Sequence, residues 1–130
     1  MRSLRFGRFW LVSGLVLLMA ILVLALSPSN RTVTVELFSD KLMHGLTFFV
    51  LMVWFCGIFR MRLAPVIALS LMSYGILIEF LQSRLPYRSA ELGDVIFDCA
   101  GILLGWAVSY AGLKVWTQTV EGWFGKTTQS

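Results

Sequence analysis

The polar residues that could support chemistry lie at the ends of long apolar segments of this 130-residue chain. They are Asp40, Lys41, His44, Glu79, Gln82, Arg88, Asp94 and Asp98. Carboxylates beside an imidazole can transfer protons, and a guanidinium can bridge two carboxylates. Oxygen ligands together with one imidazole can also hold a divalent cation, although the sequence predicts no cofactor.

Helical spacing places most of these residues on shared faces, because residues three, four and seven apart are neighbours on a helix. The three predicted faces are Asp40, His44 and Thr47; Gly75, Glu79 and Gln82; and Asp94, Asp98, Gly101, Gly105 and Ser109. The Gly101–Gly105 pair is a small-xxx-small pattern, which lets helices approach closely. We therefore expect a tight helix seam below a polar cluster.

Four apolar segments must position these faces, at about 9–26, 42–59, 64–81 and 95–113. Eighteen residues of helix span about 27 Å, close to the hydrocarbon thickness of a bilayer. Hydrophobic residues make up 58% of the chain and charged residues 14%, far below the quarter typical of soluble domains. The sequence predicts an all-α fold: a polytopic bundle of four transmembrane helices in one membrane domain, with a polar tail at 114–130.

The positive charges predict the orientation of these helices. Seven fall on one side: Arg2, Arg5, Arg8, Arg60, Arg62, Lys114 and Lys126. Four fall on the other, where acidic residues balance them: Arg31, Lys41, Arg84 and Arg88. Both termini are therefore predicted to be cytoplasmic, and the loops 27–41 and 82–94 to face outward. The first segment is longer than the apolar region of a signal peptide, which favours a retained helix over a cleaved leader.

The polar cluster has a functional and a structural interpretation. Glu79 and Asp98 lie in or at the edge of the apolar layer, where a lone charge costs at least about 2.5 kcal/mol. Arg88 is the expected partner of one of them, and Gln82 or His44 of the other. The same groups could instead form a polar network that only fixes helix register, with Asp40 and Asp94 as favourable charges at helix N-termini.

The order of these motifs resembles the VanZ-like family of small bacterial membrane proteins. The residues that carry the resemblance are Asp40, Lys41, His44, Phe48, Gly75, Glu79, Gln82, Arg88, Asp94, Gly101 and Gly105. The resemblance covers about residues 38–107 and implies a multi-pass protein of the bacterial inner membrane. It also implies a link to reduced susceptibility to teicoplanin, with no assigned biochemical activity. The family pattern usually has Asn where this chain has Asp98, which weakens the transfer of any mechanism.

Two classes of function compete at this point. The chain is either a binding or scaffold protein of the cell envelope, or a membrane-embedded hydrolase or transferase acting on a lipid-linked substrate. Its expected partners are the lipid bilayer and either a lipid-linked envelope precursor or another membrane protein, with no nucleic acid. An enzyme needs a wet cleft that reaches His44, Glu79 and Asp98 together, whereas a scaffold needs these groups paired and closed to solvent.

Overall fold

The computed structural model describes residues 2–28, 36–87 and 91–126, with only the backbone described for 36–39, 125 and 126. It contains five α-helices and two 3-10 turns in these ranges. They are α1 (Gly7–Leu26), α2 (Glu36–Ile58), η1 (Met61–Leu63), α3 (Ala64–Gln82), α4 (Leu92–Ala111), η2 (Leu113–Val115) and α5 (Trp116–Lys126). The described residues contain no strand, so the predicted all-α fold is confirmed.

Four of the helices are long and apolar enough to cross a membrane, as the sequence predicted. These spans are Gly7–Leu26, Asp40–Ile58, Met61–Gln82 and Leu92–Ala111. Each begins or ends within a few residues of its predicted position. Pro65 lies in the first turn of α3, where its missing N–H breaks no helical hydrogen bond.

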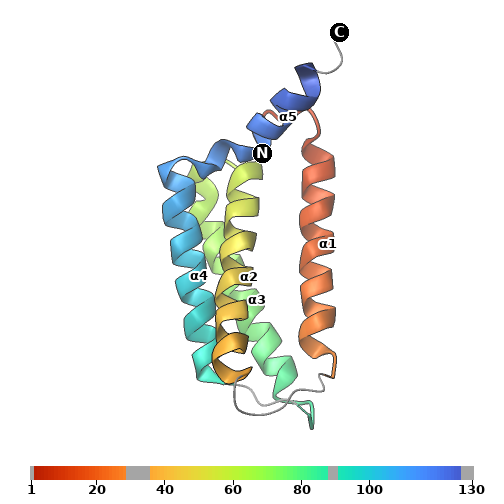
Figure 1. Cartoon of the computed structure of the whole chain (residues 1–130), viewed down its shortest axis with the longest axis vertical. Helices are drawn as coiled ribbons and strands as arrows, with labels where there is room; N and C mark the ends of the chain where they lie inside the picture. Colours follow the sequence, from red (N-terminus) through yellow and green to blue (C-terminus); the bar gives the residue numbers. More distant parts are fainter. Residues whose placement is uncertain (1, 29–35, 88–90, 127–130) are drawn as a thin grey trace.

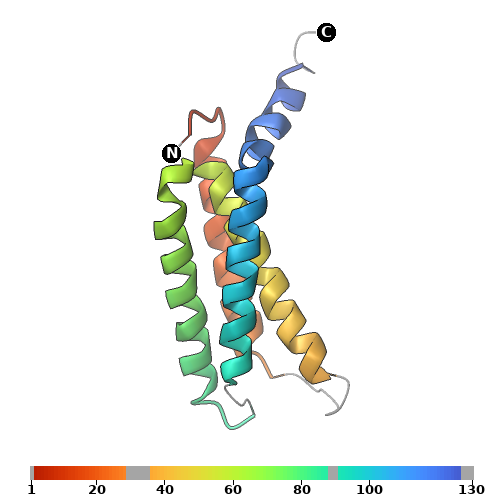
Figure 2. The same ribbon diagram turned by 90° about the vertical axis from the view of Figure 1, so that its left-hand side faces the viewer.

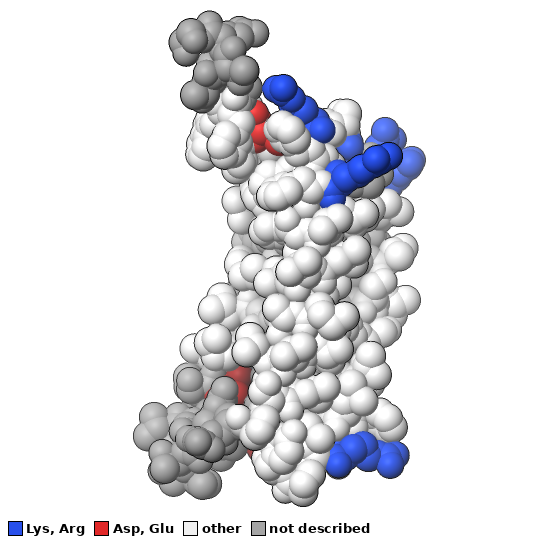
Figure 3. All heavy atoms as spheres, turned by 90° about the vertical axis from the view of Figure 1, so that its right-hand side faces the viewer, with Lys and Arg blue, Asp and Glu red and all other residues white. Residues whose placement is uncertain are grey.

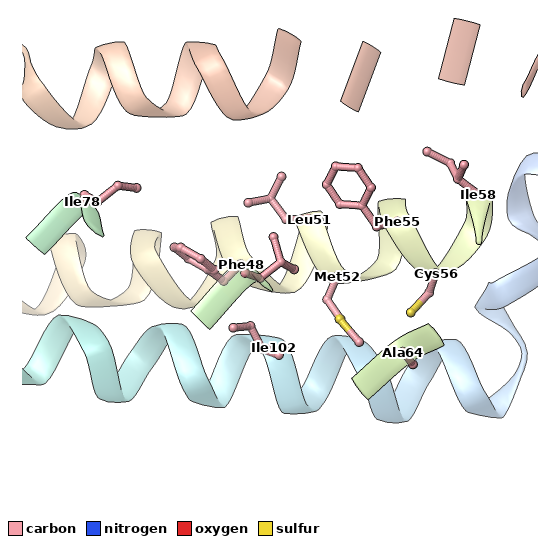
Figure 4. Packing of buried hydrophobic residues seen from close by; sticks show 10 residues of the cluster. Phe48, Leu51, Met52, Phe55, Cys56, Ile58, Ala64, Ile78 and Ile102 are labelled. Carbon is pink, nitrogen blue, oxygen red and sulfur yellow. The ribbon is translucent and has the colours of Figure 1, made fainter. Parts of the chain in front are cut away.

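The spans alternate in direction (Figures 1 and 2), and α2 packs against each of the other three. Figure 4 shows the side chains of α2 that make these contacts: Leu51 and Phe55 point toward α1, and Met52 and Cys56 point toward α4. Phe48, Leu51, Met52 and Cys56 are almost fully buried. The hydrophobic core is thus built around one helix.

The closest packing in the core is the seam between α2 and α4. A Cβ atom on Gly101 would lie 2.0 Å from the carbonyl oxygen of Gly45, and one on Gly105 would lie 2.8 Å from that of Phe49. Only glycine leaves room for such backbone proximity. All members of the predicted α4 face, from Asp94 to Ser109, are buried. The predicted seam is therefore confirmed.

The segment after the fourth span forms α5, a helix that the sequence analysis did not expect. Trp116 donates its indole N–H to the Val53 carbonyl (3.1 Å), and buried Thr117 donates its hydroxyl to the Gly57 carbonyl (2.8 Å). These bonds satisfy carbonyl groups in the C-terminal half of α2. They fix the start of α5 on the end of the bundle where α1 also begins (Figure 1).

Charged side chains lie at the two ends of the bundle (Figure 3). On the face shown, a broad belt of uncharged side chains separates the charged groups, and most of the basic ones lie at the end that carries the start of α1. Such a belt fits a bilayer, where charges within the hydrocarbon layer are costly.

Candidate polar site at one end of the bundle

The polar cluster lies at the opposite end, where the start of α2, the end of α3 and the start of α4 meet (Figure 1). α2 contributes Asp40, Lys41 and His44. α3 contributes Glu79 and Gln82, and α4 contributes Asp94 and Asp98. The three predicted faces therefore meet at one level of the bundle.

His44 and Asp98 form the central contact of the cluster. Nδ1 of His44 lies 3.1 Å from Oδ1 of Asp98, and Nε2 lies 4.0 Å from Oδ2 of Asp94. A carboxylate accepts a hydrogen bond, so the proton of a neutral His44 lies on Nδ1 and Nε2 carries a lone pair. Asp98 is 1% exposed and holds the ring from its buried side.

Lys41 and Glu91 close the cluster toward the start of α4. The ammonium group of Lys41 binds the Glu91 carboxylate and lies 3.4 Å from Oδ1 of Asp94. The Glu91 backbone N–H donates to Oε2 of Glu79 (3.1 Å). Glu91 was not predicted as a site residue, although its position three residues before Asp94 places it beside the cluster once α4 starts at Leu92.

Two buried carboxylate oxygens in the cluster, Oε1 of Glu79 and Oδ2 of Asp98, have no hydrogen-bond partner among the described residues. A Cβ atom on Gly75 would lie 2.6 Å from Oδ2 of Asp98. Gly75 therefore provides the space into which the Asp98 carboxylate projects from α4 toward α3. A buried carboxylate oxygen without a hydrogen-bond donor is costly.

Gln82 does not bond to either carboxylate but reaches across to α1, where its amide donates to the Ala25 carbonyl (2.9 Å). Beside this link a cavity of about 380 Å³ separates the end of α1 from α2 and α3. Its polar lining residues are Ser27, Asp40, His44, Thr47 and Gln82, and its apolar ones are Ile21, Leu24, Ala25, Pro28, Met43, Phe48 and Ile78.

The cavity reaches His44 but not Glu79 or Asp98, which lie behind it and are 7% and 1% exposed. The arrangement is thus neither the open cleft expected of an enzyme nor the closed network expected of a scaffold. A polar group in the cavity would meet the imidazole and Asp40 directly. It would be influenced by Asp98 only through the His44 ring.

Six of the eight predicted residues, Asp40, Lys41, His44, Glu79, Asp94 and Asp98, lie in one connected group. Gln82 lines the adjoining cavity. Arg88, the predicted partner of a buried carboxylate, lies outside the described residues. The side chains that could hold a metal ion are Asp40, His44 and Asp94, whose ligand atoms lie within 4.8 Å of one another.

Comparison with known proteins gives one match. A family model described as VanZ/LLP1 matches residues 9–114, which includes all four spans except the first two residues of α1. Neither a curated protein nor a solved structure matches the chain.

Proposed function

The chain belongs to the VanZ/LLP1 family, and from this premise we propose that it binds an amphipathic lipid of the bacterial envelope at the outer leaflet of the plasma membrane. The polar cluster holds the head group, and the cavity between α1 and the α2–α3 pair holds the first part of the hydrocarbon chain. A lipid-linked envelope precursor is the ligand class with this combination of properties.

The mixed lining of the cavity is the observation that carries this proposal. His44 and Asp40 supply hydrogen-bonding and charged groups, whereas Phe48 and Ile78 form apolar wall. A purely polar solute would leave the wall in contact with water, and a purely apolar one would leave the polar groups unpaired. A ligand with a head group and a chain satisfies both parts, as lipid-binding pockets require.

Filling the cavity tests the proposal directly. Thr47 lines this cavity, and Ser70 lines a second cavity near the other end of α1, so Thr47→Trp and Ser70→Trp are matched variants. Binding of a polyprenyl phosphate to the purified full chain in detergent can be measured by native mass spectrometry. We expect Thr47→Trp to weaken binding at least about tenfold, or roughly 1.4 kcal/mol, and Ser70→Trp to leave it unchanged. Equal effects of both variants, or no binding by the parent chain, would contradict the proposal.

The outer-leaflet placement follows from the positive charges of the sequence and is testable by itself. In a chain without Cys56 and Cys99, we expect Ser83→Cys to react with an impermeant thiol reagent in intact cells. Arg60→Cys, at the opposite end of α3, should react only after the membrane is opened. The reverse pattern would place the cluster at the cytoplasmic leaflet.

The resemblance to the VanZ-like family also predicts reduced susceptibility to teicoplanin when the chain is overproduced. Glu79→Gln and Asp98→Asn keep shape while removing charge, so they separate function from folding. We expect Glu79→Gln to abolish the phenotype, and Asp98→Asn to be mild because an amide is usual at that position in the family. A severe Asp98→Asn beside a silent Glu79→Gln would show that the two carboxylates are ranked wrongly.

A membrane-embedded hydrolase or transferase is the second candidate, and the His44–Asp98 contact favours it. A histidine held by a carboxylate on one nitrogen can act as a general base through the other. This function predicts product release from a lipid-linked substrate, with turnover lost in His44→Gln while binding persists. If the parent chain binds the lipid-linked substrate but does not turn it over, the enzyme function is excluded and only the lipid-binding function remains.

A further inference from the structure

Two side chains that line the cavity, Asp40 and His44, form with the neighbouring Asp94 a group that has the geometry of a metal site. The ligand atoms of Asp40, His44 and Asp94 all lie within 4.8 Å of one another. Two ligand atoms on one transition-metal ion lie at most about 4.2 Å apart, since each bond is roughly 2.1 Å long. The 4.0 Å distance from Nε2 of His44 to Oδ2 of Asp94 already fits, and no other distance between ligand atoms of the three residues exceeds 4.8 Å.

The orientation of His44 is the second observation that points to a cation. Its Nδ1 faces Asp98 at 3.1 Å, so in the neutral ring the lone pair is on Nε2 and faces a second carboxylate, Asp94. Two acceptors that face each other at 4.0 Å make no hydrogen bond. Either a second proton on the His44 ring, which would pair with Asp94, or a cation between the two atoms resolves the conflict. Metal-binding histidines almost always donate their other N–H to a carboxylate or carbonyl, as His44 does to Asp98.

The balance of charge in the cluster also favours a bound cation. Its described carboxylates are Asp40, Glu79, Glu91, Asp94 and Asp98, whereas Lys41 is the only lysine or arginine that the structure describes within it. Lys41 contacts Glu91 and Oδ1 of Asp94, whereas Oδ2 of Asp94 faces His44. A divalent cation beside Asp94 would offset negative charge at a depth where uncompensated charge is costly.

We propose that Asp40, His44 and Asp94 bind one divalent transition-metal ion, with Asp98 as the positioning residue of the His44 ring. One imidazole and two carboxylates favour Mn²⁺ or Zn²⁺ over Ca²⁺ or Mg²⁺, which prefer oxygen ligands alone. Three protein ligands leave coordination positions open, and they face the cavity because Asp40 and His44 line it. A phosphate group is the ligand class for these positions, a step that rests on the lipid-binding function proposed above.

The first experiment titrates Mn²⁺ into the purified, chelator-treated full chain in detergent and detects the bound ion by electron paramagnetic resonance. We expect one ion per chain, with nitrogen coupling from a single imidazole in the pulsed spectrum. His44→Gln should remove the nitrogen coupling, and Asp94→Asn should weaken binding. Glu121→Gln, which removes a carboxylate at the opposite end of the bundle, is the matched control and should bind like the parent chain.

Asp98→Asn tests the positioning role. Because outer-shell partners tune metal affinity, and an amide oxygen still accepts the Nδ1 proton of His44, we expect it to weaken Mn²⁺ binding only about tenfold and to alter the nitrogen coupling without removing it. Thermal unfolding in chelator shows that each variant folds. No bound ion in the parent chain, or equal binding by His44→Gln and Glu121→Gln, would overturn the proposal.

A second experiment separates the metal site from the lipid function. Binding of polyprenyl phosphate, inorganic phosphate and the uncharged polyprenol is measured with Mn²⁺ and with chelator. The metal site predicts that Mn²⁺ strengthens binding of the polyprenyl phosphate more than that of the polyprenol. Inorganic phosphate shows whether the phosphate group binds without the hydrocarbon chain. Lipid binding that is indifferent to Mn²⁺ and to His44→Gln would overturn the metal inference and leave the lipid function standing. Mn²⁺ binding without any lipid binding would overturn the lipid function and leave the metal inference standing.

Discussion

Both α4 and α1 pack against α2, but they differ in how closely their backbones approach it. Glycines on α2 and α4 bring the two backbones together, so that an added Cβ on Gly101 would overlap the Gly45 carbonyl. On α1 only Gly14 is buried among the described residues, and cavities of about 380 Å³ lie beside both halves of the helix. We call α2 and α4, which pack backbone against backbone, the frame, and α1, which packs less closely, the wall.

Besides its apolar packing, the α1 wall is attached to α3 by polar links. Tyr74 donates its hydroxyl to the Leu18 carbonyl, and Gln82 donates to that of Ala25. In a bilayer, apolar packing between helices gains little over contact with lipid, so such hydrogen bonds weigh more in holding a helix in place. The candidate site lies at the boundary, with Asp40, Asp94 and Asp98 on the frame and its cavity against the wall. In the proposed function, this arrangement holds the polar groups in place while a hydrocarbon chain enters between α1 and the bundle.

Breaking the α2–α4 seam should have the largest effect. Gly101→Ala places a Cβ atom against the Gly45 backbone, which cannot move away by rotating a side chain. We expect a loss of about 3 kcal/mol in unfolding free energy, measured by denaturant titration in detergent, or failure to insert. Gly122→Ala on α5, where a Cβ would meet nothing within 4 Å, is the control and should not destabilise. A mild Gly101→Ala would show that the seam is not rigid.

Weakening the α1 wall should have a smaller and more local effect. Tyr74→Phe removes the hydrogen bond to the Leu18 carbonyl while keeping the ring beside Phe48. The expected cost is about 1 kcal/mol. Hydrogen exchange should increase in α1 but not in α4. The exposed Tyr110 on α4 provides the control, since Tyr110→Phe should change neither helix. Faster exchange in α4 as well would mean that the two regions are not independent.

The sequence predicted the frame well because its signals are local. Each span is a long apolar run, and the positions of Asp94, Asp98, Gly101 and Gly105 follow one helical face, all of which is buried. The depth of the polar cluster followed from the same spacing. The hydrogen bond from the Glu91 backbone to Glu79 could not be predicted from this spacing, because it depends on the residue at which α4 begins.

The wall and α5 could not be predicted in the same way, because long-range contacts determine them. α5 is short and polar, and it is placed by bonds from Trp116 and Thr117 to carbonyls about sixty residues earlier in the chain. Similarly, the cavity depends on where α1 lies relative to α2, which a uniformly apolar helix does not specify. No periodic pattern in the sequence carries this information.

The smallest expected effect concerns the link from α5 to the start of α1. The Glu121 carboxylate accepts the backbone N–H groups of Arg5 (2.8 Å) and Phe6 (2.9 Å) and the indole N–H of Trp10 (2.9 Å). It thereby acts as an N-terminal cap supplied from a distant part of the chain, since α1 has no side-chain cap of its own.

Partial burial raises the pKa of Glu121, but these hydrogen bonds and the Arg5 charge outweigh it and hold the pKa below its ordinary value of 4.5. The carboxylate therefore stabilises the fold above that value, and this contribution is lost as the pH falls through the lowered folded pKa. Glu121→Gln should increase hydrogen exchange slightly in the first turn of α1 at neutral pH, and the difference from the parent chain should vanish in acid. The exposed Thr119 on the same helix supplies the control, Thr119→Ala, which should show no such dependence on pH. A Glu121→Gln effect that persists in acid would assign the link to packing instead of charge, and this end of α1 would then be held by its tryptophan contacts and by the hydrogen bonds of Arg2 to the carbonyls of Ile58 and Phe59.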